Sequence, residues 1–168
     1  MSQEYRVIKN KVDVQVTLVG QNPFQLTLFL AAQARSHAGH ERIIDVLNGK
    51  ELFLPAINAS GNLCLIRRDA VVMVSVPYER DGEGADEEAE EGSLPPVRRA
   101  TVEVVLDGGT TVRGLIEYSM PEGRRRLVDY LNLDDGFLSV RHDGTIYHVN
   151  RHHIARVDEL KEPFLVSG

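Results

Sequence analysis

The sequence predicts a mainly β fold built from two tandem units of five strands each, because it contains an internal repeat and short alternating apolar segments. When residues 39–56 (GHERIIDVLNGKELFLPA) are set over residues 123–140 (GRRRLVDYLNLDDGFLSV), seven of the eighteen positions are identical. Residues 61–74 align in the same way with residues 144–157, sharing Gly61/Gly144, Arg68/Arg151 and Val74/Val157. Because the matches keep one order along the whole unit, they indicate a duplication.

Each unit shows the alternation of apolar and polar residues that is typical of half-buried strands. In the first strand, Val14 and Val16 correspond to Val102 and Val104. Gly-containing turns separate the strands, and Asp143-Gly144 favours the positive φ angles of a tight hairpin. The predicted strands of the two units cover, in order, 12–18 and 102–106, 24–31 and 111–118, 52–58 and 136–141, 62–67 and 145–150, and 71–76 and 154–158.

An insert separates the second and third strands of each unit, at residues 35–50 and 119–135. Within it, RIIDVLN and RLVDYLN place apolar residues at i, i+1 and i+4, which suits one face of a short helix. Alternation within the first of these motifs is also compatible with a strand. We expect the shared pairs Asp45/Asp129 and Asn48/Asn132 to cap or turn this segment, in preference to a catalytic role for the aspartates.

The net charge of −6 belongs mainly to one segment between the two units. Residues 79–96 (ERDGEGADEEAEEGSLPP) hold eight acidic side chains and one arginine, whereas the flanking residues are nearly neutral. A segment with no apolar periodicity and this charge density is expected to form an extended, disordered linker. We interpret it as a solubilising spacer, the alternative being an acidic mimic of nucleic acid. The predicted domains are therefore 1–78 and 97–168, joined by the linker at 79–96.

The composition of the 168 residues, 42% hydrophobic and 26% charged, is that of an ordinary folded domain. The apolar runs are too short to cross a bilayer, and the N-terminus lacks the apolar core of a secretory signal. Cys64 is the single cysteine, so no internal disulfide can form. These features predict a cytoplasmic protein that does not insert into a membrane.

Two stretches of the second unit, VEVVLDGGTTVRGLIEYS (102–119) and DGTIYHVNRHHIARV (143–157), resemble the Sm-like family, which includes the bacterial Sm-like RNA chaperone. The resemblance implies that each unit is a small SH3-like barrel of five strands. It also implies that Arg151 and His152 stand where the family contacts uridine-rich RNA. Asn150 replaces the family's aromatic residue there, and the first unit has Arg67, Arg68 and Asp69 instead, so the family's RNA site is not intact.

The residue types that support catalysis or metal binding are sparse. His148 and His152 have an i, i+4 spacing that converges on a metal only within one helix, and we predict a strand end there. Cys64 lies in an apolar strand (NLCLI), which is typical of a buried thiol rather than a nucleophile. No glycine-rich phosphate loop follows a strand. The sequence thus predicts no metal, no cofactor and no enzymatic activity.

Two functions from different classes fit this pattern. The first is a protein-interaction or scaffolding module that pairs its barrel edge strands with a protein partner or with further copies. If the units associate as Sm-like barrels do, three chains close a ring of six barrels. The alternative is an RNA-binding Sm-like protein that uses Arg151, His152 and the basic run of Arg124, Arg125 and Arg126. We favour the first, because the repeated features are apolar while the basic residues differ between units.

Overall fold

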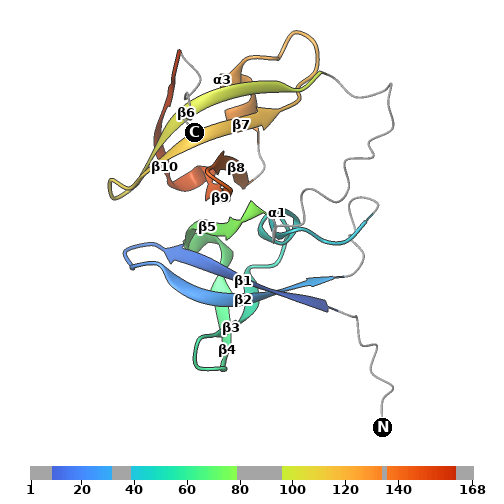
Figure 1. The fold of residues 1–168 in the computed structure, drawn as a ribbon, viewed down its shortest axis with the longest axis vertical. Coiled ribbons are helices and arrows are strands. Elements are labelled where there is room, and N and C mark those ends of the chain that lie inside the picture. The colour runs from blue at the N-terminus through green and yellow to red at the C-terminus, as the bar shows by residue number, and fades with distance from the viewer. Residues whose placement is uncertain (1–8, 32–38, 79–95, 134–135, 162–168) are drawn as a thin grey trace.

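The computed structural model describes residues 9–31, 39–78, 96–133 and 136–161, and these contain ten strands in a single antiparallel sheet (Figure 1). The predicted linker lies outside the described residues, apart from Pro96. No helix in the described part of the chain is long and apolar enough to span a bilayer. The strands are β1 (Lys9–Leu18), β2 (Phe24–Ala31), β3 (Phe53–Asn58), β4 (Leu63–Arg67), β5 (Val71–Pro77), β6 (Arg98–Leu106), β7 (Thr111–Tyr118), β8 (Phe137–His142), β9 (Thr145–Asn150) and β10 (Ile154–Glu159).

The order of strands in the sheet corrects the predicted architecture. Strands run β10-β6-β7-β8-β9-β5-β1-β2-β3-β4, so each half contributes five neighbouring strands in the same internal order. The prediction of two separate five-stranded barrels was wrong, because β9 of the second half pairs with β5 of the first and joins the halves into one open sheet. The two ends of this sheet are β10 and β4, which lie far apart (Figure 1).

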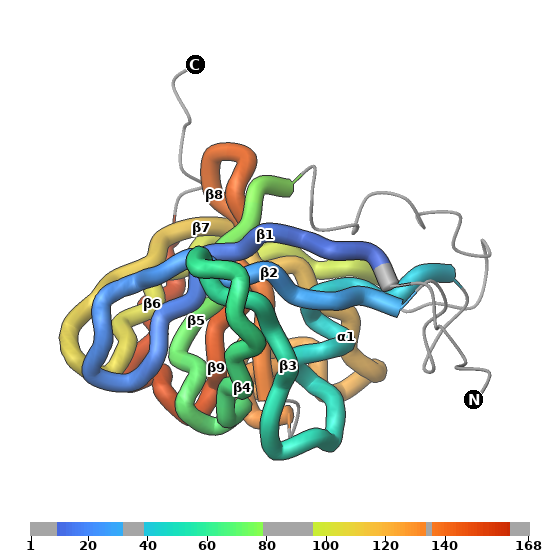
Figure 2. Tube along the Cα trace, turned by 90° about the horizontal axis from the view of Figure 1, so that it is seen from below, coloured from blue at the N-terminus to red at the C-terminus, as the bar shows by residue number. Residues whose placement is uncertain are grey.

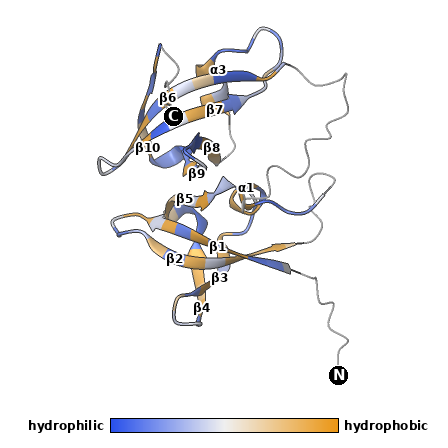
Figure 3. Ribbon diagram, viewed as in Figure 1, coloured by the Kyte–Doolittle hydropathy of each residue, from blue (hydrophilic) through white to orange (hydrophobic). Residues whose placement is uncertain are grey.

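Each half wraps around its own apolar core, and the long hairpins β1–β2 and β6–β7 curve across the molecule (Figure 2). The alternation recognised in the sequence places every second residue inside. On β6 the buried positions are Ala100, Val102, Val104 and Leu106, with exposed or half-buried residues between them. The ribbon coloured by hydropathy shows the same alternation along the strands of both halves (Figure 3). This burial of one face is what stabilises strands of this pattern.

Both inserts contain the expected short helix, α1 (Ile43–Leu47) in the first half and α3 (Leu127–Leu131) in the second. The side chain of Asp45 accepts the backbone N–H of Arg42 at 2.8 Å, and Asp129 accepts that of Arg126 at 3.1 Å. These bonds satisfy amide groups that the first turn of a helix leaves without a partner. The predicted capping role of the two aspartates is therefore confirmed.

The tight connection between β8 and β9 also follows the sequence. Asp143 and Gly144 both have positive φ angles, of 46° and 74°, which is the conformation of a type I′ turn. This turn aligns β8 and β9 residue by residue, from Phe137 opposite Asn150 to His142 opposite Thr145. The hairpin so formed carries the surface through which the second half meets the first.

Candidate interaction surface at the edges of the sheet

The two halves meet along a strand pair that we call the inner seam, β5 with β9. The strands are antiparallel and in register over five residue pairs, including Val74 opposite His148 and Val76 opposite Ile146. Beyond the strands, the backbone N–H of Tyr78 donates to the carbonyl of Gly144 at 2.7 Å. The seam therefore satisfies backbone groups that would otherwise form two open sheet edges.

Side chains from each half complete the core of the other at the inner seam. Phe137 of β8 and Ile146 of β9 belong to the apolar cluster of the first half, and both are almost completely buried. In the opposite direction, Val72 of β5 packs into the cluster of the second half. Burying an apolar side chain of this size contributes about 1.5–3 kcal/mol, so the junction is stabilised by core packing as well as by strand pairing.

The side chains of two asparagines, Asn48 and Asn150, form hydrogen bonds between the halves, and those of Asn48 hold α1 against β8. The side chain of Asn48, at the C-terminal end of α1, accepts the backbone N–H of Phe137 at 2.7 Å. Its amide group also donates to the carbonyl of Phe137, at 3.4 Å. A second bond crosses the seam from Asn150, whose side-chain amide donates to the Val71 carbonyl at 2.9 Å. These asparagines join the halves through backbone atoms, so their geometry depends on the register of the strands.

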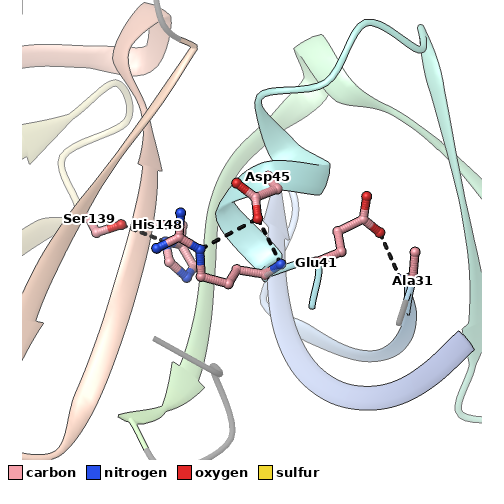
Figure 4. Close-up of polar contacts among 6 residues, drawn as sticks. Ala31, Glu41, Asp45, Ser139 and His148 are labelled. Atoms are coloured by element: carbon pink, nitrogen blue, oxygen red, sulfur yellow. Dashed lines mark hydrogen bonds and ion pairs between the residues drawn. The ribbon is translucent and has the colours of Figure 1, made fainter. Parts of the chain in front are cut away.

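A buried histidine also lies at the inner seam. His148 on β9 has no exposed surface, and its Nδ1 lies 2.8 Å from the hydroxyl of Ser139 on β8. Figure 4 shows this pair beside the segment of the first half that carries Glu41 and Asp45. A polar group in such a position is tolerated when it has a hydrogen-bond partner. The contact joins β8 to β9 on the strand that also pairs with β5 of the first half.

The outer edge at β4 carries exposed apolar residues. In the sequence repeat these residues align with buried residues at the inner seam. Leu63 and Leu65 on β4 are 67% and 61% exposed, and Phe53 on β3 is 51% exposed. Their aligned counterparts are buried: Ile146 and His148 have no exposed surface, and Phe137 is 3% exposed. The first half thus presents an uncovered apolar face where the second half has a covered one.

The other outer edge is formed by β10 together with α3. These elements align in the sequence repeat with β5 and α1, which cover the buried face at the inner seam. Val128 on α3 is 48% exposed, and Asn132, which aligns with Asn48, is exposed at the C-terminal end of the same helix. Leu131 is half-buried, whereas the aligned Leu47 of α1 is fully buried. The helix α3 is therefore open on the side where α1 packs against β8.

The structure places the residues predicted to contact RNA at the second half. The Arg151 guanidinium donates to the carbonyls of Phe137 at 3.1 Å and Tyr130 at 3.3 Å, and it lies 5.0 Å from the centre of the Tyr130 ring. Arg151 thus holds the end of α3 against β8. His152 is exposed in the short 3-10 turn before β10, and its backbone N–H donates to the side chain of Asn150.

The basic run before α3 is engaged with the helix rather than gathered around a pocket. Arg126 forms an ion pair with Asp129 at 3.2 Å, and this hydrogen bond lowers the pKa of the Asp129 carboxyl. The carbonyl of Arg125 accepts the hydroxyl of Tyr118 at 3.2 Å, and burial raises the pKa of that hydroxyl. Arg124 is exposed. Arg126 is exposed as well, so the side chains of Arg124 and Arg126 both lie at the surface, and Arg125 is half-buried.

Sequence analysis missed the residues that define this surface, namely Asn48, Phe53, Leu63 and Leu65. Two signals pointed to them. The run Leu63–Ile66 is apolar at every position, which is typical of a strand covered on both faces rather than on one. The Asn48/Asn132 pair was noticed only as a local cap, although the side chain of Asn48 reaches the other half.

The structure also locates His148 and His152, whose sequence spacing is that of metal ligands on a helix. His148 is on a strand and His152 on the following turn, so their spacing does not bring them to one helix face. Within the described ranges, no three His, Cys, Asp or Glu side chains are placed to hold a metal ion. Comparisons with protein-family models, curated proteins and solved structures found no match.

Proposed function

We propose that the chain is a non-enzymatic protein-interaction module, built from two Sm-like units that arose by duplication, and that it acts through its outer edge strands β4 and β10. The observation that carries the proposal is the exposed apolar face of Phe53, Leu63 and Leu65 at one end of an open sheet. An edge strand offers a row of backbone donors and acceptors to any strand that adds to it.

The two edge strands differ in the number of charged residues that they carry. Many proteins protect edge strands with charged residues, and β10 carries Arg156, Asp158 and Glu159. In contrast, the only charged residue of β4 is Arg67, at its last position. Single exposed apolar residues are common on protein surfaces, whereas contiguous apolar patches mark interaction sites. The apolar, exposed β4, which has few charges, is therefore favoured as a binding surface.

Photo-crosslinking in the organism that encodes the chain tests this proposal directly. A benzophenone side chain placed at Leu65 is expected to form covalent adducts with protein. The matched control position is Gln15, which is also exposed but lies on β1, a strand paired on both sides. Adducts with protein at Leu65 and not at Gln15 support the proposal, whereas no adduct from either position contradicts it. Adducts with RNA at Leu65 would instead favour the alternative function.

A further inference from the structure

The strand pair β1–β5 ends earlier than its counterpart in the second half, β6–β10. On the side of the β1 N-terminus, the last residues in register are Gln15 and Ser75. In the second half the pairing runs two residues further, to the point where the backbone N–H of Leu160 donates to the carbonyl of Thr101 at 2.8 Å. The strands β1 and β5 therefore part at a place where β6 and β10 stay together.

A proline at the end of β5 explains this difference. Continued without a gap, the sequence repeat aligns Pro77 with Leu160, and it aligns Asp13 with Thr101. Because proline has no backbone N–H, Pro77 cannot donate to the carbonyl of Asp13 as Leu160 donates to that of Thr101. The strand β5 keeps its other neighbour, since Pro77 still lies opposite Thr145 of β9.

A cleft of about 300 Å³ opens where β1 and β5 part, and we call it the β1–β5 cleft. Side chains that carry oxygen atoms line it from four strands, namely those of Asp13, Gln15, Gln25, Ser75 and Thr145. Among the described residues of the lining, Asp13 alone is charged. It is exposed, and one oxygen of its carboxylate accepts the hydroxyl of Thr27 at 2.6 Å. The cleft is therefore rich in hydrogen-bond acceptors and carries a negative charge.

We propose that the β1–β5 cleft binds a small organic cation that contains a guanidinium group. The acceptors are the carboxylate of Asp13, its backbone carbonyl, the amide oxygens of two glutamines and two hydroxyls. A guanidinium is planar and donates five N–H groups, so it bonds acceptors on several strands at once, whereas an ammonium has three donors. This site goes beyond the proposed function, because β1 and β5 lie in the middle of the sheet and away from both outer edges.

The size of the cleft and the charges beside it set the expected ligand and its affinity. Ligand sites usually measure about 300–1,000 Å³, so this cleft suits a small compound. A ligand with one positive charge matches the one carboxylate of the lining. Lys11 lies on the same face of β1, two residues before Asp13, and repels a cation. We therefore expect a dissociation constant on the order of 1 mM, as for a few exposed charge-assisted hydrogen bonds.

A titration followed by nuclear magnetic resonance tests the proposal on the full chain. The probe is methylguanidinium, and methylammonium at the same concentration is the control of equal charge. We expect methylguanidinium to shift the backbone amides of Asp13, Ser75 and Thr145 in a saturable way, and to bind at least about fivefold more tightly than methylammonium. Equal affinity for both cations, or shifts that do not saturate at the cleft, would overturn the proposal.

Two matched variants separate the site from general attraction of a cation to an acidic protein. Asp13→Asn removes the charge but keeps an oxygen acceptor for Thr27, and it should weaken binding roughly tenfold. Asp69→Asn removes the same charge from an exposed residue of the same half, outside the cleft, and it should leave binding unchanged. Equal weakening in the two variants would contradict a specific site.

A third variant closes the cleft without changing any of its acceptors. Pro77→Leu supplies the backbone N–H that Leu160 has in the second half, so β5 should pair further along β1 and binding of methylguanidinium should be lost. Slow amide exchange at position 77 verifies the new pairing independently. Binding that persists in a variant with this amide protected would overturn the proposal. A small ligand forms no protein adduct at Gln15, so the crosslinking test at Leu65 remains independent of this outcome.

Discussion

The inner seam and the outer edges are built from aligned residues, yet one is a core and the other a surface. Phe137 and Ile146 are buried by a neighbouring half, whereas the aligned Phe53 and Leu63 are exposed. Asn48 bonds the backbone of Phe137, whereas the aligned Asn132 is exposed. Whether an apolar residue of these strands is buried therefore depends on the neighbouring strand and helix. The apolar pattern of the strand itself does not determine its burial.

The two environments also differ in polarity. Inside the inner seam, His148 occupies the place of Leu65 and bonds to Ser139, whereas on the outer edge the residue aligned with Ser139 is Pro55, which is exposed and lies opposite Leu65. Burial of a bonded polar group costs desolvation but penalises alternative registers, because a shifted histidine would lose its partner. Both residues belong to the second half, so this pair holds β8 and β9 in one register.

The largest predicted effect on stability comes from placing a charged residue at aligned positions of the inner seam and the outer edge. Ile146→Asp puts an unpaired carboxylate into the core at the inner seam and should lower the free energy of unfolding by about 4 kcal/mol or more. Leu63→Asp changes the aligned residue at the outer edge and should shift the stability of the dilute protein by less than about 0.5 kcal/mol. Urea denaturation of both variants, monitored by circular dichroism, measures the contrast. Equal destabilisation would mean that the outer face is covered within one molecule.

A smaller effect is expected for the two asparagines. Asn48→Ala removes both bonds to Phe137 and leaves a backbone N–H without its acceptor, which should cost about 1–3 kcal/mol. Asn132→Ala should leave the stability of the dilute protein unchanged. Thermal unfolding at low protein concentration distinguishes them, and a loss of stability in Asn132→Ala as large as in Asn48→Ala would show that the two asparagines have the same role within one chain.

The smallest effect is a dependence on pH at α3. The hydrogen bond from Arg126 lowers the pKa of Asp129 below its ordinary value of 3.8, so the ionised carboxylate stabilises the folded state. This contribution is fully present above pH 3.8 and is lost as the pH falls through the lowered pKa of the folded protein. Asp129→Asn should therefore unfold at a lower temperature than wild type at pH 7. The difference should shrink below pH 3.8, and a difference that grows with acidity would contradict the assignment.

Local structure was largely predictable, because it depends on residues close together in the chain. Alternating valines and the Asp143-Gly144 turn located strands and hairpins, and the apolar spacing of RLVDYLN located α3. The bounds of β2, β7 and β9 agree with the predicted ranges 24–31, 111–118 and 145–150. These features follow from side-chain alternation and turn geometry, which act over a few residues.

The joining of the halves could not be predicted in the same way. It depends on β5 and β9 meeting across some 70 residues of chain, and periodicity contains no information on which edges meet. Burial of His148 was equally inaccessible, since it requires the hydroxyl of Ser139 on the neighbouring strand. The continuous apolar run of β4 was the one local sign of an interface, and its meaning becomes clear only beside the buried β9.

Amide hydrogen exchange, resolved by strand and measured on the dilute protein, tests the central claim most directly. Amides of β5 and β9 should be protected at about 1 μM, because the inner seam is intramolecular. Amides of β4 and β10 that face away from the sheet should exchange rapidly at the same concentration. If these amides are protected as strongly as those of β5 and β9, the outer edges are covered within one molecule and are not free to bind a partner.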